Sequence, residues 1–553
     1  MQIDAWGKGS VKGSCRTGNL GSRKGSRVFG LPGKRVWSVC LVLGLGGQVV
    51  LAQDTKSPAA PQTNRLGLLE TVRQTLSLDP NIHLQQREVE ASRGRALEAS
   101  GAFDIRLTSQ LDRSLERQGI RVSALDFTHQ VAHLTSYRAG VSKLLRTGVE
   151  VTPSLKIIQR EERGALIPPE NQSEVSFQIR VPLARGFGSK VTTAQERASK
   201  IILEVSRLDL RHIVATRVLQ TVRAYWAYLS ATRRLEILTL SEQRAQELLD
   251  KTQALVDANE VPAAELLQLK ANLADKTANR IAGQQTLIEA RHQLGIAIGI
   301  PLERMTVLPS PGDEFPSAAA PPVRDEDSSE RFIGEALARR SDLASVRLRE
   351  DAERIRLLAA RNRLKPQIDL IVRGGYAGIN AGSRTRDYLS VLGENVEGMT
   401  VFGGLSFDFP PANREARGQF LQQEALWQQQ GILLADLQRK IQSGVIVAMQ
   451  QLRHRAEELK KSEEAIAQYM TAVQNEQAKR QLGLATLINV LEMEDRLIGA
   501  SLGNLSAQEQ FAIGLAQLRF ETGTLVTGEE PGEVITLQQL ITVPPVAKPP
   551  GTQ

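Results

Sequence analysis

The sequence predicts a mainly α-helical protein that also contains β-strands and is built from two internal structural repeats. Apolar residues recur every three or four positions over about 66 residues from Lys190 onward, which is the period of a long amphipathic helix. Between the long helices the period shortens to two, as in β-strands. A displacement of 224 residues aligns 259–299 with 483–523 without a gap. Together these observations favour long paired helices interrupted by strands.

The N-terminal segment 1–52 has the composition of a secretory signal peptide. It carries eight basic residues and one acidic residue, so it supplies +7 of the formal net charge of +8. A basic region ending at Arg35 precedes an apolar stretch from Val36 to Leu51, and we expect cleavage after Ala52. The alternative is an anchoring helix, but a spanning helix needs roughly 18 to 20 apolar residues. Because the charge lies mostly in this segment, we expect no nucleic acid partner.

We expect no enzyme, no cofactor and no metal site. Both cysteines, Cys15 and Cys40, lie in the expected signal peptide. The remaining chain therefore lacks the thiols that disulfides, cysteine-ligated zinc or a cysteine nucleophile would require. His129 and His133 form a close histidine pair, but no third ligand is apparent, and a pair of loop residues is the simpler interpretation.

The first repeat is expected at 53–299. It begins with a helix, continues with β-strands within 102–183, and ends with a long helix hairpin over 190–298. The first helix of this hairpin contains no proline, and at 1.5 Å per residue it would be about 100 Å long. A further strand hairpin is expected between Tyr137 and Ile158, and its role stays open.

The second repeat is expected at 332–525, with a helix, β-strands within 366–409 and a long helix hairpin over 412–523. Proline-rich residues 300–331 are expected to form a linker between the repeats. The proline-rich tail 526–553 is expected to be disordered.

Helix lengths suggest which shorter helices lie end to end beside the long ones. Helix 262–298 followed by helix 333–363 would match the first long helix, because their lengths of roughly 55 and 45 Å add to about 100 Å. Helix 484–523 followed by helix 66–100 would match the second. This pairing is an expectation from length alone.

The expected strands have one apolar and one charged face. Phe103 to Leu111 and Val175 to Leu183 alternate in this way, which is the pattern of an outer-membrane β-barrel with lipid outside and water inside. Half-buried strands of a soluble sheet are the alternative. Hairpins inserted between such long helices have no layer to pack against in a monomer, and one chain has too few strands for a conducting barrel. We therefore expect several identical chains to form one barrel.

Four motifs carry a family resemblance: VPLARGFG at 181–188, FDFPP at 407–411, NEVPAAELL at 259–267 and GLATLINVL at 483–491. With these motifs the chain resembles the TolC-like outer-membrane efflux family, the outer membrane factors, over nearly all of 65–525. The resemblance implies a homotrimer: a transmembrane β-barrel in the cell outer membrane, joined to a long α-helical coiled-coil barrel that forms a tunnel through the periplasm. It also implies an efflux or type I secretion channel that works with a periplasmic adaptor (membrane fusion) protein and an inner-membrane transporter.

The resemblance also assigns functional positions. The gate at the periplasmic tip would be formed by Glu492, Asn489 and Glu265. The adaptor would contact Asn259, Val261, Pro262, Gly483, Leu484 and Ala485. The strand–helix junctions would contain Pro182, Gly186, Gly188 and Pro410.

Three features keep alternatives open. Asn489 stands where the family often has a second acid, and Ala485 and Arg480 occupy the positions of a tyrosine and arginine lock found in some members. Glu492 and Glu265 could also be ordinary solvated acids on a helix surface. An exported periplasmic coiled-coil adaptor or structural protein is the alternative function. Substrate and transporter class do not follow from the sequence.

Overall fold

The computed structural model describes residues 65–121, 127–162, 168–317, 326–393, 396–526 and 535–544. The chain divides into two units, 1–62 and 63–553, and all described residues belong to the second unit. The expected signal peptide therefore lies outside the described residues. Within those residues, no helix is both long and apolar enough to cross a bilayer.

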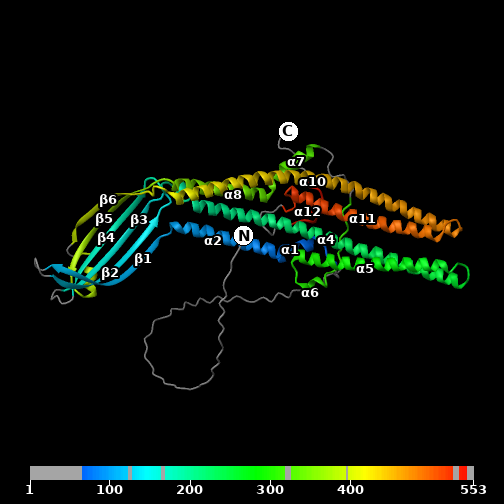
Figure 1. The fold of residues 1–553 in the computed structure, drawn as a ribbon, viewed down its shortest axis with the longest axis horizontal. Coiled ribbons are helices and arrows are strands. Elements are labelled where there is room, and N and C mark those ends of the chain that lie inside the picture. The colour runs from blue at the N-terminus through cyan, green and yellow to red at the C-terminus, as the bar shows by residue number, and fades with distance from the viewer. Residues whose placement is uncertain are drawn as a thin grey trace, which may run out of the picture. The chain divides into compact units, whose positions relative to one another are not determined.

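The described residues form helices and one antiparallel sheet, which confirms the mainly α-helical class with β-structure (Figure 1). The first half of the chain contains α1 (Leu68–Leu78), α2 (Pro80–Ser100), a 3-10 turn (Gly101–Phe103), β1 (Arg106–Arg121), β2 (Phe127–Leu144), β3 (Glu150–Glu162), β4 (Glu170–Pro182), α3 (Ser189–Thr192), α4 (Ala194–Asp257), α5 (Ala264–Ile298) and α6 (Leu302–Met305). The second half contains α7 (Glu326–Arg339), α8 (Ser341–Arg363), β5 (Gln367–Ala381), α9 (Thr385–Ser390), β6 (Val396–Asp408), α10 (Arg414–Gln481), α11 (Leu487–Glu521) and α12 (Leu537–Ile541).

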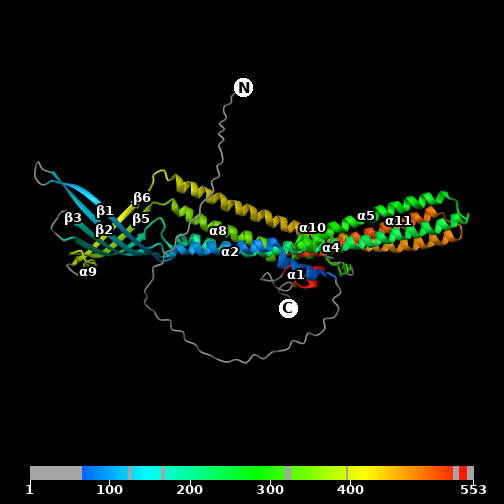
Figure 2. The same ribbon diagram turned by 90° about the horizontal axis from the view of Figure 1, so that it is seen from below.

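Two helix hairpins dominate this arrangement. α4 has 64 residues and packs against α5, whereas α10 has 68 residues and packs against α11. At 1.5 Å per residue each long helix extends about 100 Å. Both shorter partners have 35 residues. Figures 1 and 2 place the two hairpin turns together at the end of this unit that lies opposite the sheet.

The shorter helices lie end to end in a different order from the one expected from length. At Gly299, which ends α5, a Cβ atom would lie 2.7 Å from the Leu78 carbonyl oxygen and 3.0 Å from Pro80 Cδ. The corner between α1 and α2 therefore lies directly against the C-terminal end of α5, and α2 follows α5 end to end. At Gly523, just after α11, a Cβ atom would lie 3.2 Å from the backbone of Arg339 and Arg340, where α8 begins.

The expected joining of 262–298 to 333–363, and of 484–523 to 66–100, is therefore wrong. Helices α2 and α8 have 21 and 23 residues, so either order gives nearly the same total length. The contacts at the two glycine joints establish the observed order, and α10 accordingly packs against α8. The segment expected as one helix at 66–100 is also divided, because Pro80 starts α2 and Asp79 caps it through the Asn81 and Ile82 backbone amides.

The main hydrophobic core lies where these joints meet the middle of α4. It contains Val222, Tyr225 and Trp226 of α4 and Leu68 of α1, all essentially inaccessible to solvent. Residues of the expected linker also pack there: the Tyr225 hydroxyl donates a 2.6 Å hydrogen bond to Asp313, and the Phe315 and Trp226 rings lie 5.3 Å apart. The described part of the linker is thus ordered, and α7 begins at Glu326, before the expected boundary at 332.

The tail 526–553 contains order that composition did not indicate. Residues 535–544 are described and include α12, whose Leu540 is fully buried in the main core. The Arg519 guanidinium donates to the Thr542 hydroxyl at 2.7 Å. The expectation of disorder is therefore wrong for these ten residues, because Ile535 and Leu540 give a proline-rich segment enough apolar surface to bury.

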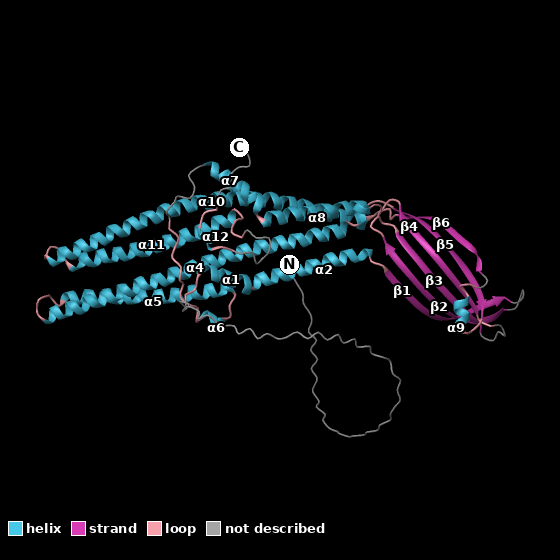
Figure 3. Cartoon of the chain, turned by 180° about the vertical axis from the view of Figure 1, so that it is seen from behind, coloured by secondary structure: helices cyan, strands magenta, loops and turns pink. Residues whose placement is uncertain are grey.

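The six strands form one antiparallel sheet in the chain order β1-β2-β3-β4-β5-β6, visible at the end of the helices in Figure 3. The hairpin expected between Tyr137 and Ile158 is formed by β2 and β3, and its strands lie inside this sheet. His129 and His133, interpreted as loop residues, instead lie in β2. No group of three or more potential metal ligands occurs among the residues that the structure describes.

We predict that Gly299→Ala weakens the joint between α5 and α2. Gly299 has a φ of 86°, and the added methyl group would meet the Leu78 carbonyl oxygen, so the free energy of unfolding should fall by about 1 to 3 kcal/mol. Gly334→Ala is the control, because Gly334 lies in α7 with open space around it and alanine favours a helix by about 0.5 to 1 kcal/mol. Chemical denaturation followed by circular dichroism measures both. Equal or greater stability of the Gly299 variant would contradict the joint.

Candidate functional site

One face of the sheet is apolar and exposed. Strand register places Leu107 opposite Val141, Leu155 opposite Val175, and Leu370 opposite Leu405, all on the same side. The side chains at the two edge strands are largely exposed, at 79% for Leu107 and 71% for Leu405. The same face also carries Leu111, Tyr137, Phe177, Val372, Tyr376, Val401 and Phe407. Toward the central strands the apolar side chains are half-buried, as Leu155 and Val175 are. An exposed apolar surface of this kind marks a surface that contacts lipid or another protein.

The opposite face of the sheet is polar. Glu150 of β3 faces Arg180 of β4 in the register, and the two side chains form an ion pair. Arg180 also lies 3.8 Å from Asp369 of β5. The Ser154 and Ser176 hydroxyls share a 2.9 Å hydrogen bond across the same two strands. The alternation with a period of two, expected from the sequence, therefore corresponds to two chemically distinct faces of the sheet.

The outer edges of β1 and β6 have no partner strand among the described residues. Each edge presents a row of backbone donors and acceptors that pairs readily with another strand. The sheet of one chain is open, so closure needs strands from elsewhere.

The junctions between strands and helices depend on unusual backbone conformations. Gly186 and Gly188 have φ of 81° and 94°, a region that favours glycine. Pro182 ends β4, and Pro410 follows β6 and accepts a hydrogen bond from the Asn413 backbone amide at 3.1 Å. These four residues, expected at the junctions from the sequence, lie where each strand turns into a helix.

Arg146 fastens the β2–β3 turn to the start of α4. Its guanidinium donates two hydrogen bonds, of 3.0 and 3.1 Å, to the buried carboxylate of Glu196, and it lies 4.9 Å above the Phe103 ring. Lys200 donates a third bond at 2.8 Å. The hydrogen bonds from Arg146 and then from Lys200 lower the pKa of Glu196 to about 2. This contact was not expected, because Arg146 and Glu196 are far apart in the sequence.

We predict that Glu196→Gln lowers the free energy of unfolding at neutral pH by about 1 to 3 kcal/mol, the range for buried hydrogen-bonded groups. The carboxylate's stabilisation is fully present above its ordinary pKa of 4.5 and is lost as the pH falls toward about 2. The difference between variant and wild type should therefore shrink over that interval. Urea titrations at several pH values measure it. Glu204→Gln, in an exposed pair with Arg207, is the control; an equal effect there would contradict the assignment.

The two hairpin turns have matching backbones. Asn259 and Gly483, two of the residues expected to contact an adaptor, have φ of 60° and 74° and are related by the displacement of 224. Among the other expected contact residues, Pro262 and Leu484 are exposed, whereas Val261 and Ala485 are half-buried. Leu267, Leu482 and Leu484 leave apolar side chains exposed around the turns. The turns thus present a mixed apolar and polar surface.

The expected gate residues have local partners on their own helices. Glu492 is exposed and accepts a 2.5 Å bond from Arg496 one turn later on α11. The Asn489 backbone amide lies 3.4 Å from the Thr486 hydroxyl, which caps α11. Glu265 lies in the first turn of α5, on the other hairpin. The single chain therefore places Glu492 and Glu265 on separate hairpins, and their role at a gate stays a prediction.

An ion pair joins the two hairpins. Lys276 of α5 contacts the Asp495 carboxylate of α11, and the Lys276 side chain is only 14% exposed. Sequence reasoning missed this pair because its members are 219 positions apart. The i,i+4 spacing of Glu492 and Arg496, by contrast, was a signal present in the sequence.

Several solved structures are similar to the chain in architecture, at low sequence identity. No family model matches the sequence, and no curated protein matches it. The outer-membrane channel OprN aligns over 82% of this chain and 89% of its own, with a TM-score of 0.62 and 18% identity. This chain has the fold of the outer-membrane channels. The Campylobacter jejuni outer membrane channel CmeC aligns over 83% and 85% (TM-score 0.60, 12% identity), and the channel-forming CusC over 86% and 99% (TM-score 0.61, 13% identity).

The outer-membrane channel fold accounts for the element order of the chain. The alignments with OprN and CusC cover 89% and 99% of those chains and 82% and 86% of this chain. The similarity therefore includes both the helices and the sheet. At identities below one fifth, the similarity establishes the fold and leaves the activity to be argued from the surfaces described above.

Proposed function

We propose that the chain is a subunit of a TolC-like outer-membrane channel. It would export substrates across the periplasm and outer membrane as part of a tripartite efflux or type I secretion system, and it would catalyse no reaction. Its sheet would lie in the cell outer membrane, and its helices would extend into the periplasm. The observation that carries the proposal is the open sheet with one exposed apolar face and one polar face.

Closure of the sheet supports a homotrimer. A hydrocarbon environment tolerates no unpaired strand edges, so β1 of one copy would pair with β6 of the next. Six strands from each of three copies would give about 18 strands, the number found in barrels that enclose an aqueous channel. The apolar face would contact outer-membrane lipid, and the polar face would line the channel.

The helices offer matching lateral surfaces. Leu84 and Leu97 of α2 and Leu421 and Ile432 of α10 are large apolar side chains that the chain leaves exposed. In a closed ring, these faces of α2 and α10 would pack against neighbouring copies. Burial of each side chain contributes about 1.5 to 3 kcal/mol, so a ring would recover energy that a monomer does not.

The hairpin turns are the proposed docking surface for a periplasmic adaptor and an inner-membrane transporter. The two turns share their backbone conformation, which supports two equivalent structural repeats. Exposed Leu267, Leu482 and Leu484 would provide apolar contacts. The proposed mechanism is passive: partners separate the hairpins, and the ring of Glu492 side chains widens.

The decisive experiment is to express the full chain with its own leader in a two-membraned bacterium. Density fractionation gives its location, and native mass spectrometry in detergent gives its copy number. We expect a cleaved chain in three copies in the outer-membrane fraction. A detergent-independent monomer in the periplasm would overturn the proposal and favour an adaptor or spacer.

We predict that Leu405→Arg reduces the amount of assembled protein in the outer membrane. An arginine on a lipid-facing strand costs about 2 to 4 kcal/mol near the bilayer midplane. Ser406→Arg is the matched control, because Ser406 is the next residue of β6 and points to the polar face. Equal yields of the two variants in the same fractionation would mean that the apolar face does not contact lipid.

We predict that Glu492→Ala raises single-channel conductance in planar bilayers, because the shorter side chain would widen the proposed ring. The same variant should reduce cation preference, because acidic rings attract cations. Glu236→Ala is the control: Glu236 is 54% exposed and paired with Arg233 on its own helix, and Glu492 is 54% exposed and paired with Arg496. Unchanged conductance and selectivity of the Glu492 variant would exclude a gating role.

A further inference from the structure

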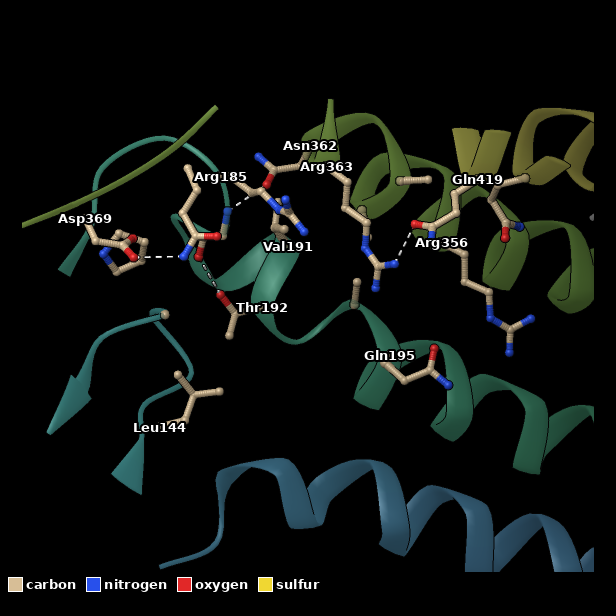
Figure 4. Close-up of a pocket in the computed structure, with 18 of the residues that line it drawn as sticks. Leu144, Arg185, Val191, Thr192, Gln195, Arg356, Asn362, Arg363, Asp369 and Gln419 are labelled. Atoms are coloured by element: carbon tan, nitrogen blue, oxygen red, sulfur yellow. Dashed lines mark hydrogen bonds between the residues drawn. The ribbon is translucent and has the colours of Figure 1, made fainter. Parts of the chain in front are cut away.

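A cavity of about 580 Å³ lies where the sheet meets the helices. Its walls come from the end of β4, the start of β5, α3 with the first turn of α4, the last turns of α8 and the start of α10 (Figure 4). The strand residues that line it include Arg180 and Asp369, which lie on the polar face of the sheet. The cavity is therefore on the side opposite the exposed apolar face.

The charge of the lining is predominantly positive. Four arginines contribute, Arg180, Arg185, Arg356 and Arg363, whereas Asp369 is the one acidic residue that lines the cavity. Arginine guanidinium groups are planar and present several N–H donors, which suits them to bind the oxygens of carboxylates and phosphates in pairs.

Two of the four arginines are already neutralised by carboxylates. Arg180 pairs with Glu150 and Asp369, and Arg356 pairs with Glu353. Arg185 and Arg363 form no ion pair with any carboxylate among the described residues. Arg363 instead donates a 2.7 Å hydrogen bond to the neutral amide oxygen of Gln419. The cavity thus holds two cationic groups whose charge the chain does not balance.

The rest of the polar lining consists largely of amides. Five glutamine residues and one asparagine line the cavity: Gln195, Gln367, Gln419, Gln422, Gln423 and Asn362. Asn362 accepts a 2.8 Å hydrogen bond from the Gly186 backbone amide, which holds the loop carrying Arg185 against α8. Amide NH₂ groups donate hydrogen bonds without adding charge. Three of these amides already donate to carboxylates: Gln367 to Asp369, Gln419 to Glu415 and Gln423 to Glu353. Among the described residues, the NH₂ groups of Gln195, Gln422 and Asn362 remain to donate to the oxygen atoms of a ligand.

We propose that this cavity binds a multivalent oxyanion, with Arg185 and Arg363 as its principal charged contacts. The chemical class is a solute bearing phosphate or several carboxylate groups. Since the cavity lies on the polar side of the sheet, the ligand is a water-borne solute and not a membrane lipid. The position of this site along a conduit rests on the proposed function, but binding itself requires no transport.

The test uses inorganic pyrophosphate and the purified full chain in a neutral detergent at low ionic strength. Isothermal titration calorimetry should show saturable binding to the wild type. Arg185→Ala/Arg363→Ala should weaken it at least about tenfold, because each charge-assisted hydrogen bond lost corresponds to a factor of ten or more. Arg417→Ala/Arg439→Ala is the control: it removes the same charge from exposed arginines of α10 outside the cavity and should change affinity less than twofold.

A second measurement needs no variant and remains valid if the double substitution disturbs folding. Phenylglyoxal modifies accessible arginines, and mass spectrometry locates the modified residues. Pyrophosphate should slow modification of Arg185 and Arg363 and leave Arg417 unaffected. Absence of saturable binding by the wild type, equal weakening in the two double variants, or no protection of Arg185 and Arg363 would each overturn the site. Any of these results would leave the membrane location and copy number of the channel untouched.

Discussion

The structure depends on covering two uninterrupted helices along their whole length. α4 and α10 have 64 and 68 residues, but their hairpin partners have only 35 each. A second short helix must therefore continue each partner, and the chain supplies α2 and α8. Gly299 and Gly523 allow the ends of the short helices to approach closely, so that these helices together cover each long helix without a gap. The central core forms at this level, where α1, α12 and the linker fill the remaining space.

Features set by periodicity could be predicted from the sequence. The long helices, the alternating strands and the hairpin of β2 and β3 all follow from the spacing of apolar residues over neighbouring positions. The order in which short helices meet could not be predicted this way, because α2 and α8 are nearly equal in length. The ordered tail was missed for a related reason: composition indicated disorder, whereas two apolar side chains, Ile535 and Leu540, were enough to anchor it.

The candidate sites likewise differ in whether neighbouring or distant residues form them. The junction glycines and the turn residues were found because motifs of contiguous residues mark them. The pair of Arg146 with Glu196, the pair of Lys276 with Asp495, and the cavity of arginines were not found, since each combines residues from separate elements. The local partners of Glu492 and Asn489 lay within four positions and could have been predicted from helix spacing alone.

The two hairpin turns share a left-handed residue but not its chemistry. Glycine adopts this conformation without a steric penalty, whereas asparagine, although tolerant, carries a Cβ atom that restricts its neighbouring conformations. The turn at Gly483 can therefore change its backbone angles at lower cost than the turn at Asn259. In a ring of three chains, compliant and stiff turns would alternate around the axis, so a force applied equally to all six would deform every second one first.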